Sequence, residues 1–131
     1  MTPGAPAAGQ VQAAEQTRQL AEDAELLRIY IGERDRYLGR PLCEALVEAA
    51  NSRGLAGATV IKGVLGFGAR RRIHTAKILR LSADLPVIVE IVDLTARIEA
   101  FLPVVAAMVE GGTITVSKVR AVLHPLVRIR T

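Results

Sequence analysis

The segment from Gly66 to Lys77 holds the groups of this 131-residue sequence that are best suited to binding a ligand. Its glycines would let a ligand approach the main chain, and its arginines offer planar, fork-shaped donors to a phosphate or carboxylate group. The candidate ligand-binding residues of the segment are Gly66, Gly68, Arg70, Arg71, Arg72, His74 and Lys77. We expect an anion to bind here; the simpler alternative is a solvated basic loop whose glycines only form turns.

The glycine spacing of this segment does not match the common nucleotide-binding motifs. A dinucleotide fingerprint requires a third glycine and a following helix, whereas a basic stretch follows Gly68. A P-loop requires Gly-Lys-Ser or Gly-Lys-Thr after Gly66, and the sequence has neither. No nucleophile, base and orienting group stand at a characteristic spacing, so we expect a binding protein rather than an enzyme.

Histidine and cysteine give weaker signals. His74 and His124 are the only histidines, and a metal site would need a carboxylate such as Glu90 or Glu110 without any characteristic spacing to support it. We therefore expect no metal, and interpret His74 as a loop hydrogen-bonding group or an effector contact that could respond to pH near neutrality. Cys43 is the single cysteine, which excludes an internal disulfide, and is interpreted as a small buried hydrophobe.

Composition narrows the classes of partner. The formal charge is +4 and the sequence pI is near 9.8, which permits anionic partners. Only 3% of the residues are aromatic, so stacking platforms for single-stranded nucleic acid are scarce and no nucleic-acid partner is expected. No uncharged apolar run approaches the roughly 18 to 20 residues that cross a bilayer, and no signal-peptide pattern is present. We expect a cytoplasmic protein without membrane insertion.

Alternating strands and helices are expected to position these groups. Apolar periodicity predicts strands over residues 26–31, 58–65, 85–92 and 113–122. One helix is predicted to start with Pro41 as its first residue and to stop at Gly54; a second is predicted to be capped by Asp93 and closed by Gly111 and Gly112. Pro103 lies inside the second helix and predicts a bend or a break. The order βαββαβ is that of an α+β, ferredoxin-like two-layer sandwich.

Three parts of the chain are distinguished by composition. Residues 1–23 are expected to form a flexible N-terminal arm, residues 24–124 a single ferredoxin-like domain, and residues 125–131 a basic C-terminal tail. In such a domain both helices cover one face of the sheet. Strand alternation places Leu26, Tyr30, Ile88 and Val92 on the other face, and apolar groups there predict a homo-oligomer.

Several segments closely resemble the family called domain of unknown function 190. The resemblance runs from about residue 26 to 122 and rests on the matching segments 30–33, 54–60, 66–68, 73–82, 84–87, 89–93 and 101–103. That family is in turn similar to PII signalling proteins. The resemblance implies a PII-like trimer that binds small effectors in the clefts between subunits and offers a flexible loop to a protein partner.

The PII likeness also implies site residues. Lys62, the Gly66-Phe67-Gly68 turn and His74-Thr75 look like the start of the PII effector loop. The tail residues Arg128 and Arg130 look like the C-terminal PII arginines that help to hold nucleotide phosphates. Two departures stand out: no tyrosine lies between Gly66 and Pro86, and the turn Gly111-Gly112 lacks the phosphate-binding lysine of PII proteins. Gly111 and Gly112 are nevertheless candidate ligand contacts.

The sequence therefore predicts a PII-like regulatory protein that needs no cofactor and binds a small anionic effector at subunit clefts. An adenine nucleotide is one candidate effector, and the basic loop would carry the signal to an unknown protein partner. Two alternatives remain: a protein-interaction module without a small ligand, and a divalent-metal-binding trimer.

Overall fold

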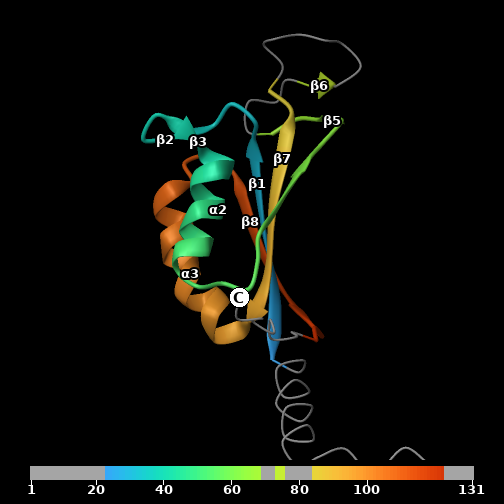
Figure 1. Ribbon diagram of the computed structural model, residues 1–131. Coiled ribbons are helices and arrows are strands. Elements are labelled where there is room, and N and C mark those ends of the chain that lie inside the picture. The colour runs from blue at the N-terminus through green and yellow to red at the C-terminus, as the bar shows by residue number, and fades with distance from the viewer. Residues whose placement is uncertain (1–22, 69–72, 76–83, 123–131) are drawn as a thin grey trace, which may run out of the picture.

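A four-stranded antiparallel sheet with both helices on one face forms the protein (Figure 1). The computed structural model describes residues 23–68, 73–75 and 84–122. Within them the sheet has the strand order β4-β7-β1-β8. Its strands are β1 (Ala24–Gly32), β4 (Thr59–Lys62), β7 (Pro86–Leu94) and β8 (Thr113–Val119). The helices are α2 (Leu42–Ser52) and α3 (Thr95–Met108). This arrangement confirms the predicted βαββαβ, ferredoxin-like two-layer sandwich.

Strand alternation explains how the core forms. Strands β1 and β7 pair from Ala24 opposite Leu94 to Gly32 opposite Pro86, and every second residue of β1 from Leu27 to Ile31 is buried. Helix α3 completes this core with Ile98, Phe101 and Val105, which recur at helical spacing and are at most 2% exposed. Burying each such side chain stabilises the fold by about 1.5–3 kcal/mol. The helix layer is therefore fixed to the sheet along its whole length.

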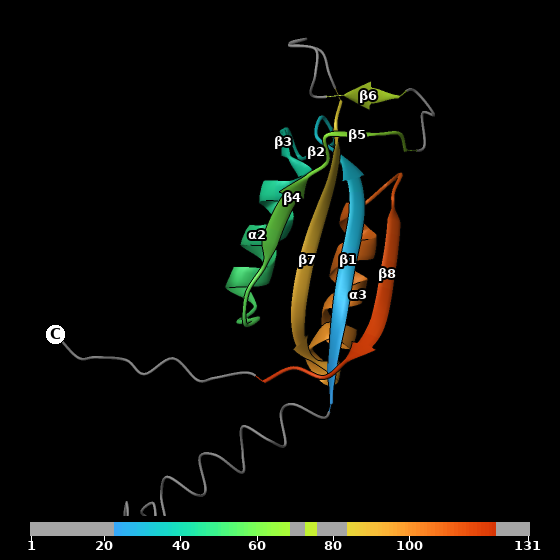
Figure 2. The same cartoon turned by 90° about the vertical axis from the view of Figure 1, so that its right-hand side faces the viewer.

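Neither α2 nor α3 covers the opposite face of the sheet, as Figure 2 shows. Leu26, Ile88 and Val92 are half-buried on this face, and Tyr30 is exposed, so the predicted placement of these residues is confirmed. Arg28 lies among them opposite Glu90, and its Nε donates to Glu90 Oε1 at 2.8 Å. This side-chain hydrogen bond, and a second one to Tyr30, raise the pKa of Arg28.

Two short ribbons stand at one end of the sheet. Strand β2 (Arg36–Tyr37) pairs with β3 (Arg40–Pro41), and β5 (Leu65–Gly66) pairs with β6 (His74–Thr75). The predicted strand 58–65 is thus divided into β4 and β5. The pairing of β4 with β7 ends at Lys62, and Gly63 N, the next donor, bonds to Pro86 O at 2.7 Å before the chain continues into β5.

Three predicted helix features are corrected by the structure. Pro41 is not the first helical residue: it ends β3, has an extended ψ of 128°, and precedes α2. Asp93 does not cap α3, because the helix starts two residues later and Leu94 stands at the N-cap. A break at Pro103 is not observed, since α3 continues through it to Met108, whereas a bend there stays a prediction. Pro103 is exposed, so water can reach the carbonyl that it leaves without a helical partner.

Candidate functional site

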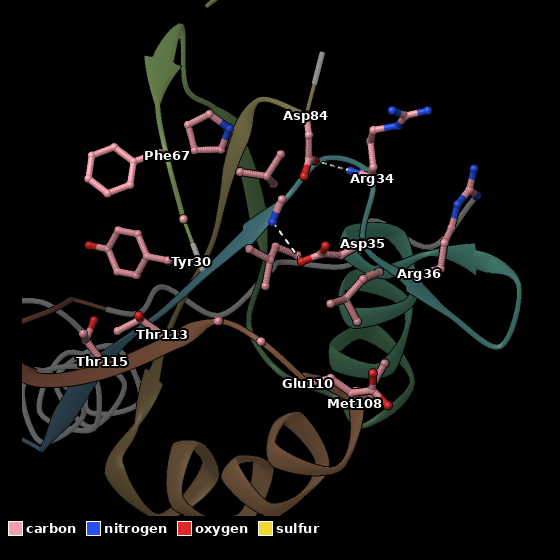
Figure 3. A pocket seen from close by; sticks show the side chains of 18 residues that line it. Tyr30, Arg34, Asp35, Arg36, Phe67, Asp84, Met108, Glu110, Thr113 and Thr115 are labelled. Atoms are coloured by element: carbon pink, nitrogen blue, oxygen red, sulfur yellow. Dashed lines mark hydrogen bonds between the residues drawn. The ribbon is translucent and has the colours of Figure 1, made fainter. Parts of the chain in front are cut away.

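A groove of about 1120 Å³ opens at the end of the sheet where β1 ends and where β7 and β8 begin (Figure 3). Residues from five parts of the chain meet there. The chemically informative ones are Tyr30, Arg34, Asp35, Arg36, Phe67, Gly68, Asp84, Glu110, Gly111, Gly112, Thr113 and Thr115. Because the groove includes residues of β1 and β8 that face the uncovered side of the sheet, it continues onto that face.

The turn from Gly32 to Arg36 carries two arginines, Arg34 and Arg36, that line this groove. Asp35 Oδ2 accepts from Gly32 N at 3.0 Å, and Asp84 Oδ1 accepts from Arg34 N at 2.8 Å (Figure 3). Glu33 N donates to Leu85 O at 2.9 Å, which ties the same turn to the start of β7. These bonds fix the main chain that carries Arg34 and Arg36, so the entropy lost when a ligand binds is reduced.

Close packing explains several glycines around the groove. A Cβ on Gly112 would lie 2.5 Å from Tyr30 O, and one on Gly32 would lie 2.7 Å from Asp84 Oδ1. A Cβ on Gly66 would meet Pro86 Cγ at 2.9 Å, so this glycine is needed for packing. By contrast, a Cβ on Gly68 or Gly111 would meet nothing within 4 Å. The main chain at these last two positions has open space beside it.

Lys62 lies outside the groove. It stands opposite the buried Val87 in the β4–β7 pairing, and therefore on the helix-covered side of the sheet. Its Nζ donates to Glu33 Oε1 at 2.6 Å, and this hydrogen bond raises the pKa of Lys62. Lys62 thus supports the turn that carries the arginines instead of lining the groove.

Positively and negatively charged residues line the groove. Arg34 and Arg36 contribute positive charge, while Asp35, Asp84 and Glu110 contribute carboxylates. In Figure 3 the rings of Tyr30 and Phe67 lie on one side of the groove and the two arginines on the other. Such a surface suits a ligand with an anionic end and an aromatic or hydroxyl-bearing end better than a simple inorganic anion.

The predicted site residues divide into four groups. Gly68, Gly111 and Gly112 line the groove, whereas Lys62 and Gly66 support its walls. The main chain at His74 pairs with Gly66 in the β5–β6 ribbon. The remaining predicted residues lie outside the described residues: Arg70, Arg71, Arg72, Lys77, Arg128 and Arg130.

Arg34, Arg36 and Asp84 are groove residues that the sequence analysis missed. A signal was present, because Glu33-Arg34-Asp35-Arg36 is a charged run directly after the glycine that ends the first strand. Within the described ranges, no three histidine, cysteine or acidic side chains are grouped closely enough to hold a metal ion. No described helix is long and apolar enough to span a bilayer.

The chain matches the model of a known protein family over most of its length. The model of domain of unknown function 190 (DUF190), described as "Uncharacterized ACR", matches residues 24–121. The chain belongs to the DUF190 family. This match confirms the resemblance drawn from the sequence and covers the whole sheet and both helices.

The chain is also similar to curated relatives and, in fold, to a solved structure. A "UPF0166 protein" of Aquifex aeolicus is 37% identical over 98 residues, covering 75% of this chain and 92% of the relative. One of Methanocaldococcus jannaschii is 39% identical over 80 residues, covering 61% of this chain and 73% of the relative.

The solved structure is CPII, "a nitrogen regulatory PII-like protein" from Thiomonas intermedia K12, bound to ADP, AMP and bicarbonate. It aligns with a TM-score of 0.51 at 14% identity, covering 76% of this chain and 88% of CPII. The DUF190 chain therefore has a PII-like ferredoxin fold.

Proposed function

We propose that this DUF190 chain is a PII-like regulatory protein that binds a small anionic effector in the groove at the end of its sheet. An adenine nucleotide is the effector that the groove chemistry favours. The observation that supports the proposal best is the groove itself, a space of about 1120 Å³ with Arg34 and Arg36 on one side and Tyr30 and Phe67 on the other.

Each part of a nucleotide has a complementary group in this groove. Arg34 and Arg36 would donate charge-assisted hydrogen bonds to the phosphates. Glu110 would accept from ribose hydroxyls, as acidic residues do in other nucleotide sites. Tyr30 and Phe67 would stack on the base, a contact that contributes about 1–3 kcal/mol in other proteins. CPII, which shares the fold, binds ADP, AMP and bicarbonate, and this supports the ligand class.

We further propose that copies of the chain associate through the uncovered face and form a trimer in the cytoplasm. Tyr30, Thr113 and Thr115 belong both to that face and to the groove, so a second copy would add a wall to it. The basic segment that follows Gly68 would then carry the signal of effector binding to a protein partner.

Calorimetry on the full chain with AMP, ADP, ATP and bicarbonate tests this function. Replacing Arg34 and Arg36 by alanine should weaken nucleotide binding at least tenfold, because each charge-assisted hydrogen bond contributes about 1.5–3 kcal/mol. The matched control is Arg120→Ala, which removes an exposed arginine after the end of β8. Failure of every nucleotide to bind, or equal affinities in both variants, would refute the proposal.

Exposed apolar residues near the β5–β6 ribbon favour one alternative, a protein-interaction module. Val64, Leu65, Phe67 and Ile73 are between 57% and 72% exposed. A module of this kind would bind its partner with an affinity that nucleotides leave unchanged, whereas a regulator would show a nucleotide-dependent affinity.

A further inference from the structure

A second cavity, of about 530 Å³, lies at the other end of the helix layer. Helix α2 starts beside the groove at Leu42 and runs to this cavity, while α3 starts beside the cavity and returns to the groove at Met108. The residues that line the cavity are Arg53, Gly54, Leu55, Arg97, Ala100 and Phe101. None of these lining residues is acidic, in contrast to the groove.

Arg97 is held in place by a buried carboxylate. Its Nη1 donates to Gly54 O at 2.9 Å and lies 3.8 Å from Asp93 Oδ2. Asp93 is only 1% exposed and accepts from Ala56 N at 2.9 Å and from Leu94 N at 2.7 Å. Both of these contacts with the described residues are made by Nη1 of Arg97. Its Nε and Nη2 can therefore still donate to a ligand.

Arg53 supplies the second guanidinium from the end of α2. The turn that carries it is fixed: Arg53 N donates to Ala49 O at 3.2 Å and Gly54 N to Asn51 O at 3.1 Å. Gly54 has a φ of +75°, which favours glycine at this position. Because these bonds satisfy helix carbonyls at the negative end of the α2 dipole, less negative charge faces the cavity.

The remaining side chains of the cavity wall are apolar. Phe101 is 2% exposed and forms a rigid part of the cavity wall together with Leu55 and Ala100. Arg53 and Arg97 are therefore the two charged groups among the lining residues, and the others carry no charge.

We propose that this cavity binds a small organic anion, consisting of a carboxylate or phosphate group on a short apolar body. The groups that would recognise it all come from a single chain. The site is therefore separate from the nucleotide groove and does not depend on the function proposed for that groove.

Phenyl phosphate and inorganic phosphate are suitable probes, observed through the amide resonances of the isotope-labelled full chain. Phenyl phosphate should bind more tightly, because its ring can bury apolar surface of Leu55 and Ala100. Saturable shifts are expected at Gly54, Leu55 and Ala100. No saturable shift, or shifts confined to Gly111 and Gly112, would overturn the proposal.

Variants separate recognition from folding. Arg53→Ala removes an exposed side chain and should weaken phenyl phosphate about tenfold, since one charge-assisted hydrogen bond is lost. Arg97→Lys keeps the charge but loses the fork and should also weaken binding. Arg120→Ala removes an exposed arginine that lines neither the groove nor the cavity; it is the matched control and should change nothing. Equal affinity in Arg53→Ala and Arg120→Ala would refute the site, provided that their amide spectra remain native.

Discussion

The groove and the cavity lie at opposite ends of the same pair of helices, yet they differ in two respects. The groove combines arginines with three carboxylates and continues onto the uncovered face of the sheet, whereas the cavity has only cationic and apolar walls within one chain. Ligand selection should therefore differ. The groove should prefer a large ligand with several chemical groups and should need assembly, while the cavity should accept a small anion in an isolated subunit.

The largest expected effect is on assembly. Val92 lies half-buried on the uncovered face, opposite Leu26 and far along β7 from the groove. Val92→Lys should yield a monomer by light scattering and abolish nucleotide binding, because a charge on this face opposes contact between copies. Phenyl phosphate binding should persist. The control Glu99→Lys alters an exposed position of α3 and should keep the oligomer. Nucleotide binding by a monomeric Val92→Lys chain would contradict the comparison.

The second effect is on stability. Phe101 is 2% exposed where it lines the cavity, whereas Phe67 is 57% exposed where it lines the groove. Phe101→Ala should lower the free energy of unfolding by about 3–5 kcal/mol, because it leaves a void in the core. Phe67→Ala should lower it far less. Urea unfolding measures both, and comparable losses would show that the cavity wall is not part of the core.

A smaller effect concerns the groove floor. Gly112→Ala should destabilise the fold by about 1–3 kcal/mol, because its Cβ would lie 2.5 Å from Tyr30 O and force the main chain apart. The matched variant Gly111→Ala has open space and should leave stability nearly unchanged. Thermal unfolding of the pair measures the difference. If both variants melt alike, the close approach of β1 and the turn before β8 is not structurally important.

The smallest effect is electrostatic. Arg40 Nη2 donates to Glu48 Oε1, and this hydrogen bond lowers the pKa of Glu48. The stabilisation should thus be present above the ordinary glutamate pKa and should be lost as the pH falls through the lowered one. Glu48→Gln should melt slightly below the natural chain at neutral pH and together with it in strong acid. A difference that persists in acid would exclude this pair as its cause.

Much of the fold could be predicted from local patterns of apolar residues in the sequence. Alternation along β1 and β7 and helical spacing along α3 reflect which side chains leave water, and these patterns survive folding. The β2–β3 ribbon could not be predicted from such patterns, because its turn places Leu38 and Gly39 at φ of 49° and 79°. Asparagine or aspartate usually precedes glycine in such a turn, so Leu38 gave no signal.

The candidate sites were harder to predict because their contacts join distant parts of the chain. Asp84 positions Arg34 from 50 residues away, and Asp93 binds the main chain of Ala56 across 37 residues. In the sequence, Asp93 before Leu94 has the pattern of a helix cap, and only the tertiary contact with Ala56 shows its role behind Arg97. The predicted site residues include Gly68, Gly111 and Gly112, which line the groove, but not the arginines Arg34 and Arg36.

The main-chain bonds at the start of β7 have a consequence for how the family can diversify. Gly63 N donates to Pro86 O and Glu33 N to Leu85 O, so the segments that follow β4 and β1 are both held where the chain enters β7. An insertion between Thr75 and Asp84 would leave these bonds and the β5–β6 pairing in place, and closing a longer loop costs about 0.6 kcal/mol for each doubling of length. Recombination could therefore lengthen the chain at this point while the anchors of the sheet are kept.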